Sequence, residues 1–425
     1  MIVKLLHSIR AHNTKNKMLV EPRLAGDAPA PDGGFMAWVQ CASSFSLFFL
    51  SWGFVSSFGA FQTYYETINH SWSPSQISWI GSTQAFLLFG FSIVTGPVFD
   101  LGYLKSLVWT GCFLCVLGVM LTSISYEYWH LILAQGVIFG LGSGCLFIPS
   151  IAVLPAYFDK KQALALGIGA SGSAIGGIIF PIIFNRLLPT IGFGWSVRVI
   201  GFIIFLASII PVLGMRIRSR PSAVRKFFDL KAWKETPFII CSVFFFLVFM
   251  GAYIPSFYIQ SYALDINIAG GGSLPTFSLY STSDLSSGAL YIPAHFAGTY
   301  GPFNVDIICI LISGILAFTW ITIYSVPGIV LFSMFYGFFS GALTSLSPNL
   351  AVALSPDMSV LGVRLGMLLI PISVGILVGN PIAGALESYG WIALQTFTAA
   401  LLMASFVVSI VVRVLMYGKS LKVRC

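Results

Sequence analysis

The chain has little charge, and the charge it has is mostly of one sign. Charged residues make up 8% of the 425 positions, with 22 Lys and Arg against 14 Asp and Glu, whereas hydrophobic residues make up 57%. The mean hydropathy is +0.91. A soluble core cannot hide so much apolar surface. This composition therefore excludes a soluble globular protein and predicts one that is surrounded by a lipid bilayer.

Motifs for nucleotide hydrolysis and for catalysis are missing as well. The sequence has no Gly-x-x-x-x-Gly-Lys-Ser/Thr loop, no cluster of His, Cys and acidic residues at metal-ligand spacing, and no pairing of a nucleophile with a base. Cys112 and Cys115 have Cys-x-x-Cys spacing, but apolar residues surround them and no second pair follows. We therefore expect no enzyme activity, no cofactor and no metal site.

Long apolar stretches are what the chain has in abundance. A helix that spans a bilayer needs roughly 20 predominantly apolar residues, and a lipid-exposed segment must be helical to satisfy its own backbone hydrogen bonds. Eleven stretches predict such helices, at residues 36–61, 76–99, 106–125, 129–153, 163–184, 196–215, 237–258, 305–324, 327–347, 365–386 and 391–412. The expected fold class is an all-α membrane protein.

The distribution of basic residues predicts the orientation, because cytoplasmic loops carry an excess of Lys and Arg. If both termini are cytoplasmic and a weak twelfth segment at 270–300 also crosses, only Arg186 and Arg198 of the 22 basic residues lie outside. Without that crossing the last four spans invert, and Arg364, Arg413 and the basic C-terminal tail move outside. The charges therefore favour twelve crossings. They also explain the net charge of +8 without a nucleic-acid partner.

The predicted spans fall into two groups on either side of a basic stretch. We expect a disordered cytoplasmic tail at 1–33, a first six-helix bundle at 34–215, a cytoplasmic linker at 216–236, a second helix bundle at 237–416 and a cytoplasmic tail at 417–425. Two such halves can rock about a central cavity.

Two local motifs lie at the entries of the first and fifth predicted spans. In the first, Asp32 suits a helix start because its carboxylate accepts hydrogen bonds from free N–H groups. In the second, basic residues anchor the cytoplasmic end and glycines let another helix approach closely. The defining residues are Asp32, Gly33, Gly34 and Trp38 in the first motif and Tyr157, Phe158, Lys160, Gly167 and Gly172 in the second. Both closely resemble signatures of the monocarboxylate porter family of the major facilitator superfamily, in the form of its fungal members.

This resemblance implies two six-helix bundles with twelve transmembrane helices. It also suggests functional roles for two charged residues. The loop at 96–105 resembles the superfamily's gating loop, in which an acid engages a helix end and basic partners in one access state. Asp100 is therefore a candidate gating residue, although Leu101 stands where the arginine usually lies, and a solvated loop acid is the alternative. Arg364 either pairs with Asp357 as a cytoplasmic latch or only anchors its helix.

The eighth crossing that the resemblance requires is poorly formed in the sequence. Between residues 268 and 293 the chain is rich in Gly, Ser and Thr, and it lacks the apolar span and the arginine of relatives. Either this stretch is a polar helix shielded within the bundle, or a reading-frame slip or mispredicted exon edge has replaced the family's sequence. The second alternative would abolish transport by this polypeptide.

The resemblance places the first, fourth, seventh and tenth spans around a central cavity. Polar and aromatic side chains there suit hydrogen bonding to a moderately polar organic molecule, although Ser and Thr also bond their own helices. The candidates for substrate contact are Ser56, Gln135, Tyr253, Tyr336 and Asn349. Ser56 stands where animal relatives carry a lysine for proton-coupled lactate. No Asp or Glu lies at the middle of a span, so that route of proton coupling is not expected.

The resemblance therefore implies a secondary transporter that moves a small organic solute by alternating access. Its partners would be that solute and the lipid bilayer, and we expect a monomer in the plasma membrane with both termini cytoplasmic. The missing first-span lysine favours a solute larger and less charged than lactate, and hence efflux of a fungal secondary metabolite. Uptake of a monocarboxylate or a vitamin is one alternative. A non-transporting degenerate carrier or sensor is another.

Overall fold

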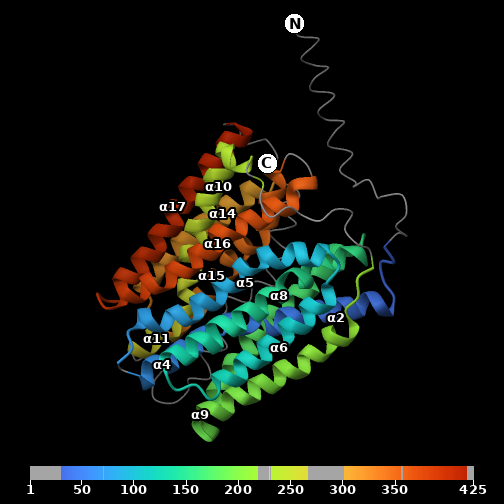
Figure 1. Ribbon diagram of the computed structural model, residues 1–425. Coiled ribbons are helices and arrows are strands. Elements are labelled where there is room, and N and C mark those ends of the chain that lie inside the picture. The colour runs from blue at the N-terminus through green and yellow to red at the C-terminus, as the bar shows by residue number, and fades with distance from the viewer. Residues whose placement is uncertain are drawn as a thin grey trace.

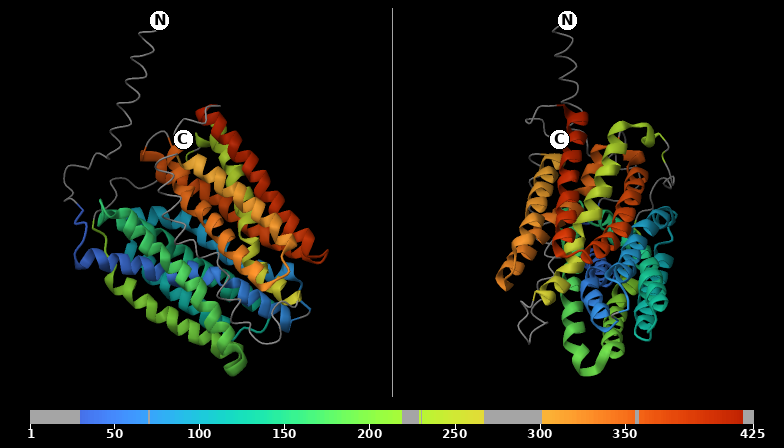
Figure 2. Two further views of the ribbon diagram at one scale, coloured as in Figure 1. Left: turned by 180° about the vertical axis from the view of Figure 1, so that it is seen from behind. Right: turned by 90° about the vertical axis from the view of Figure 1, so that its left-hand side faces the viewer.

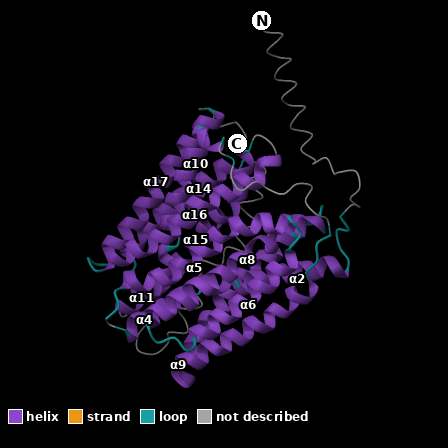
Figure 3. Cartoon of the chain, viewed as in Figure 1, coloured by secondary structure: helices purple, strands orange, loops and turns teal. Residues whose placement is uncertain are grey.

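The computed structural model describes residues 30–69, 71–218, 229, 231–266, 301–355 and 358–418, and these residues form helices without strands (Figures 1 and 3). The helices before the linker are α2 (Phe35–Leu50), α3 (Trp52–Ser56), α4 (Phe58–Ile68), α5 (Pro74–Asp100), α6 (Leu104–Thr122), α7 (Tyr128–Leu131), η1 (Ile132–Ile138), α8 (Phe139–Ala152), η2 (Leu154–Ala156) and α9 (Gln162–Gly214). Those after it are η3 (Ala232–Lys234), α10 (Thr236–Ala252), α11 (Ile254–Asp265), α14 (Pro302–Thr319), η5 (Trp320–Thr322), α15 (Val326–Ala353), α16 (Met358–Glu387) and α17 (Trp391–Tyr417).

Ten helices in the described part of the chain are long and apolar enough to cross a membrane. One of them, α9, contains two crossings, because the chain reverses at Gly192, where φ is 73° and ψ is 174°. The second leg returns to the start of α2, where Gln40 Nε2 donates to the carbonyl of Gly214 at 2.9 Å. Each predicted span thus has a helical counterpart, and the all-α membrane fold is confirmed. The weak segment at 270–300 lies outside the described residues, so a twelfth crossing stays a prediction.

The first and seventh spans are broken helices that run further than predicted. The first continues through α2, α3 and α4 to Ile68, and the seventh continues through α10 and α11 to Asp265. At the first break, the hydroxyl of Ser51 donates to the carbonyl of Leu47 at 2.5 Å, a bond to the helix's own backbone that bends helices. The extra turns are polar because they pack against protein, and hydropathy alone therefore placed the ends of these spans too early.

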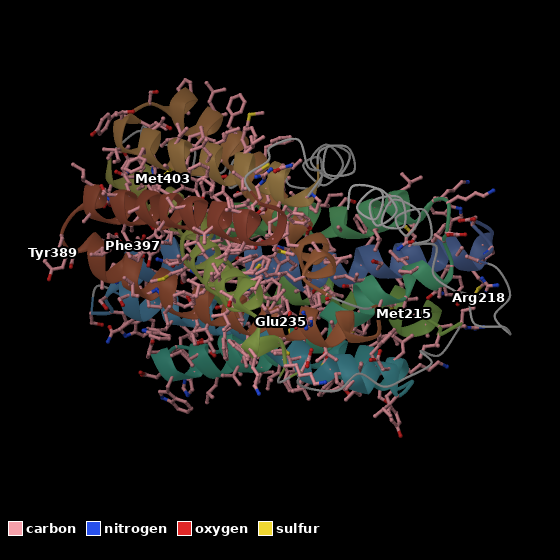
Figure 4. All side chains as sticks on the ribbon, turned by 90° about the horizontal axis from the view of Figure 1, so that it is seen from above. Met215, Arg218, Glu235, Tyr389, Phe397 and Met403 are labelled. Atoms are coloured by element: carbon pink, nitrogen blue, oxygen red, sulfur yellow. The ribbon has the colours of Figure 1, made fainter. Side chains whose placement is uncertain are left out.

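The helices form two bundles that lie side by side (Figures 1 and 2). In the first half, α2 packs on α9, and α5 and α6 pack on α8; in the second, α10 packs on α16 and α17, and α14 packs on α15 and α17. The halves meet chiefly where α5 contacts α16 and where α4 contacts α11. We call the end where α2 begins and α17 finishes the terminal end, and the opposite end the distal end. Figure 4 shows Arg218 at the terminal end and Tyr389 at the distal end.

Candidate functional site

A pocket lies where the two halves meet, level with the breaks in the first and seventh spans. Its volume is about 30 Å³, room for about two water molecules, so the halves are nearly closed around it in this structure. The first half contributes one residue from α3, and α10, α11 and α15 contribute the rest. The aromatic and hydroxyl-bearing residues that line it are Trp52, Phe249, Tyr253, Ser256, Ser340 and Thr344.

Aromatic rings form one wall of this pocket. The ring of Trp52 lies 5.6 Å from that of Tyr253 at an interplanar angle of 77°, and the ring of Phe249 lies 5.9 Å from that of Tyr253. Such contacts between rings hold their positions. Ser340 and Thr344 of α15 add hydroxyl groups to the lining. The pocket therefore combines flat apolar surface with a few hydrogen-bonding groups, which suits a ring-containing organic molecule.

The predicted substrate contacts occupy different environments in the structure. Tyr253 lines the pocket. The Tyr336 hydroxyl instead donates to the carbonyl of Ala252 at 3.0 Å, and Gln135 Oε1 accepts from the hydroxyl of Tyr65 at 2.9 Å. Both side chains are buried. Tyr336 and Gln135 thus join helices to one another, and a direct contact between either residue and a substrate stays a prediction.

Two other predicted contacts are not placed in this pocket. Ser56 ends α3, is half-buried and is not among the lining residues. Asn349 belongs to α15, but its side chain lies outside what the structure describes. Conversely, Trp52 and Phe249 were missed. Trp52 offered a signal, because it lies in the interior of a predicted span, whereas tryptophan is usually enriched at the membrane interface.

The two signature motifs form one structure at the terminal end. Asp32 Oδ1 accepts hydrogen bonds from the backbone N–H groups of Asp159 at 2.6 Å, Lys160 at 2.8 Å and Lys161 at 3.4 Å. The prediction that Asp32 caps its own helix is wrong, because α2 has no side-chain cap and the carboxylate binds the loop before α9 instead. The N–H of Asp159 is the main group that lowers the pKa of the Asp32 carboxyl below its usual value.

Ring and glycine contacts join the same two segments. The ring of Trp38 meets that of Phe158 edge to face at 5.5 Å. Further along, Gly172 of α9 lies directly against the carbonyl of Phe45 in α2, so that any side chain at this position would collide with the backbone. The signature residues therefore position α2 against α9, and this packing explains their types without assigning them a chemical role.

Asp100 lies at the terminal end, where the halves approach each other. It is the last residue of α5, and its side chain is only 4% exposed, so the alternative of a solvated loop acid is wrong. A second small pocket, of about 30 Å³, lies one turn before it along α5. Its lining includes Gly96 and Pro97 of α5 and Gly362 and Gly366 of α16. The gating role of Asp100 stays a prediction.

Arg364 is held by two acids of the linker segment that precedes its own half. Its guanidinium is 2% exposed and binds both carboxylate oxygens of Glu235, at 2.5 and 2.8 Å. It also donates to Asp229 at 3.4 Å and to the carbonyl of Leu354 at 2.6 Å. Figure 4 labels Glu235 among the helices of this half. Arg364 thus ties α16 to the start of α10 and the end of α15. The alternative partner, Asp357, lies outside the described residues.

At the distal end, by contrast, contacts cross between the halves. The hydroxyls of Thr63 in α4 and Ser261 in α11 lie 3.1 Å apart, and Ser261 donates to Glu66 Oε2 at 2.5 Å. Closer to the pocket along the same helices, the rings of Phe58 and Phe257 lie 5.0 Å apart. These contacts close the path from the pocket to the distal end.

A buried carboxylate on α14 was not among the predicted functional residues. Asp306 is 2% exposed, and its Oδ1 has no hydrogen-bond partner among the described residues. It was missed because it is only the second residue of the predicted span 305–324. An acid within a membrane helix is a functional candidate by default. Asp306, however, lies beside Cys241 inside the second half and not at the pocket.

The chain resembles known proteins over most of its length. Residues 41–303 match the model described as Major Facilitator Superfamily. The chain is 37% identical to the MFS-type transporter dbaD of Emericella nidulans, with 90% of this chain and 87% of that protein covered. It is 34% identical to the aspyridones efflux protein apdF of the same species, covering 94% and 82%. It is 33% identical to the agnestins efflux protein AgnL12 of Paecilomyces divaricatus, covering 87% and 86%.

A solved structure has the same fold. The nucleoside transporter NupG superposes with a TM-score of 0.71, covering 90% of this chain and 100% of that one. The two sequences are 15% identical, so this likeness concerns the fold alone.

Proposed function

The chain belongs to the Major Facilitator Superfamily, and on that premise we propose that it is a secondary transporter that exports a small organic molecule by alternating access. We place it in the monocarboxylate porter family, in its fungal branch, because both signature motifs are present and Asp32 joins them. The two bundles, 34–215 and 237–416, would rock about the pocket while the linker at 216–236 connects them. We infer a plasma-membrane location with both termini in the cytoplasm.

One observation carries this proposal: the pocket between the halves is closed at the distal end by contacts that only the two halves together can make. The Thr63–Ser261 and Ser261–Glu66 hydrogen bonds both join α4 to α11. If the halves rocked apart at this end, these bonds would break and the pocket would open there. A site between two bodies with breakable seals is what alternating access requires.

The chemistry of the pocket suggests the class of solute. Trp52, Phe249 and Tyr253 offer ring faces, and hydroxyls lie among them. Two relatives carry names that assign them to the efflux of aspyridones and agnestins. We propose a ring-containing secondary metabolite of moderate polarity as the solute.

The test compares the metabolites in cells and medium for strains with and without the gene. We expect the gene to lower the ratio of intracellular to external concentration for at least one such metabolite. Trp52→Ala removes a pocket wall and should abolish most of this effect. Tyr389→Ala is the matched control, because Tyr389 is 83% exposed in the turn before α17. Both variants must reach the membrane in equal amounts.

The other outcomes discriminate the remaining functions. Accumulation of a labelled monocarboxylate or vitamin inside expressing cells would reverse the direction and identify an uptake carrier. Unchanged partitioning of every solute in both directions would contradict transport and favour a degenerate carrier or a sensor.

A further inference from the structure

Three carboxylates from three helices converge at the distal end. They are Glu66 near the end of α4, Asp265 at the end of α11 and Glu387 at the end of α16. Glu66 accepts from Ser261, which lies one turn before Asp265. Helix α16 approaches the same place, because Gly384, three residues before Glu387, packs directly against a side chain of α11. Carboxylates gathered at one end of the bundle repel one another when they are ionised.

Within the described part of the chain, the groups around these carboxylates carry no compensating positive charge. Among the described residues, none of the three acids forms a salt bridge with Lys, Arg or His. Arg198 of α9 donates to the hydroxyl of Ser123 and lies over the ring of Trp195. Trp391 of α17 donates to Asp265 at 3.1 Å, and α5 presents hydroxyl groups. The other titratable neighbours are the tyrosines Tyr64, Tyr65, Tyr258 and Tyr262.

This site has fewer hydrogen-bond donors than buried oxygen atoms that could accept from them. Gln62 is fully buried, and its Nε2 donates to Glu66 Oε1 at 2.9 Å, but its Oε1 has no partner among the described residues. One carboxylate oxygen of Glu387, Oε2, is also buried without a partner in the described part of the chain. A buried ionised carboxylate needs donors, whereas a protonated one supplies an O–H donor of its own. A proton on one of these carboxylates would therefore supply the hydrogen-bond donor that the site lacks.

We propose that Glu66 and Glu387 form a proton-binding site in the seal between the halves. This inference rests on the proposed transport function. When the distal end closes, a carboxylate takes up a proton from the water on that side, and the halves come together without like charges facing each other. When the distal end opens, water reaches the carboxylates and the proton leaves to it.

The direction of the effect follows from linkage. The closed distal end binds protons more tightly than the open one, so a lower pH on that side favours the closed state. In the closed state the pocket is cut off from the distal side. For an exporter with a cytoplasmic terminal end, external acid would therefore return the empty protein to the state that loads its solute. None of the acids needs to lie at the centre of a span for this coupling.

A distance between labels across the seal tests the proposal directly. Spin labels are attached to Thr67→Cys at the exposed end of α4 and to Tyr389→Cys after α16, in the full-length protein in lipid nanodiscs. The unsubstituted chain, whose described cysteines are buried, measures background labelling. We expect one short distance at about pH 5 and a growing longer-distance population towards about pH 8, because the carboxylates repel one another once they are ionised. Glu387→Gln and Glu66→Gln should each abolish most of this pH response and keep the short distance.

Glu127→Gln provides the matched control. Glu127 is an exposed acid at the same end, in the loop before α7, and its replacement should leave the pH response intact. If the labelled protein with all its acids intact showed the same distance distribution at both pH values, the proposal would be overturned. This comparison does not depend on whether any acid variant folds. A full pH response in both Gln variants would overturn it as well. Metabolite export is measured in parallel. Intact export without a pH response rejects the proton site alone, whereas a pH response without export rejects the proposed transport and leaves the proton site standing.

Discussion

The two ends of the bundle are held by contacts of different kinds. At the terminal end, Asp32 binds the loop before α9 and Arg364 binds Glu235, and neither contact joins the first bundle to the second. At the distal end, Thr63 and Ser261 join the first half to the second. When two bodies rock, contacts within a body persist and contacts between bodies break. The terminal contacts should therefore determine the stability of each half, and the distal contacts should determine which state the protein adopts.

The chemistry of the contacts agrees with this division. The guanidinium of Arg364 is buried and fully engaged with charged or carbonyl acceptors, which makes it expensive to release. The distal bonds pair hydroxyls and one carboxylate, groups that water can solvate again when the seal opens. A gate needs contacts of the second kind, because a seal that is too strong would trap one state.

The largest expected effect comes from breaking the terminal ion pair. Arg364→Met removes the buried guanidinium and leaves the Glu235 and Asp229 carboxylates without their partner. We expect a loss of about 3 kcal/mol, at the lower end of the range for breaking a buried pair, since Glu235 is 43% exposed and can be hydrated. Thermal unfolding of the purified protein measures this loss. The distance between labels at the distal end should not change.

The control for this variant is Arg186→Met, at an exposed arginine of α9. Its unfolding temperature should match that of the original protein. If Arg364→Met unfolded at the same temperature as this control, the terminal ion pair would not stabilise the second half, and the contrast between the two ends would fail.

A smaller loss is expected from a methyl group between α2 and α9. A Cβ at Gly172 would collide with the carbonyl of Phe45, so Gly172→Ala must push the two helices apart at a cost of about 1–3 kcal/mol. Gly366→Ala has the opposite expectation. No atom lies within 4 Å of its added Cβ, and alanine favours a helix over glycine by about 1 kcal/mol. Unfolding temperatures that move in the same direction for both variants would contradict this packing.

The sequence predicted the helices well because their apolar length is a local property. It missed the true ends of the first and seventh spans, since the turns that lead to Ile68 and Asp265 contain polar residues that are buried against protein, such as Gln62 and Ser261. Hydropathy records what faces lipid and cannot show what faces protein. The twelfth crossing lies beyond the described residues and is still a prediction from charge and family likeness.

Pairings between distant residues were harder to predict than the residues themselves. Asp32 was recognised as an acceptor, but its donors lie more than a hundred positions away, and local reasoning assigned it to its own helix. For Arg364 the sequence suggested its neighbour Asp357 or no partner at all, whereas Glu235, which the fold brings to it, lies 129 positions away. Trp52 was overlooked because side chains that hydrogen-bond through a hydroxyl or amide, tyrosines included, were sought on the cavity-lining spans, whereas rings without such a group also form the pocket wall.

A third variant weakens the distal seal without touching a charge. Thr63→Val keeps the shape of the side chain and removes its hydrogen bond to Ser261. The closed state should lose about 0.5–1.5 kcal/mol, and 1 kcal/mol corresponds to about a fivefold gain in the open population. The spin-label distance at the distal end measures this shift. In Ser405→Ala, the lost hydroxyl bonds only its own helix, and the distribution should stay unchanged. Equal distributions in both variants would remove Thr63 from the seal.

The smallest expected effect concerns the charge of Asp32 at the terminal end. Its pKa is lowered from an ordinary value of 3.8, because backbone N–H groups, first that of Asp159, stabilise the ionised form. The stabilisation is therefore complete above pH 3.8 and disappears as the pH falls through the lowered pKa. Asp32→Asn should unfold at a slightly lower temperature than the original protein near neutral pH, and the difference should vanish in acid. A difference that persisted unchanged in acid would mean that the shape of the side chain, and not its charge, joins α2 to the loop before α9.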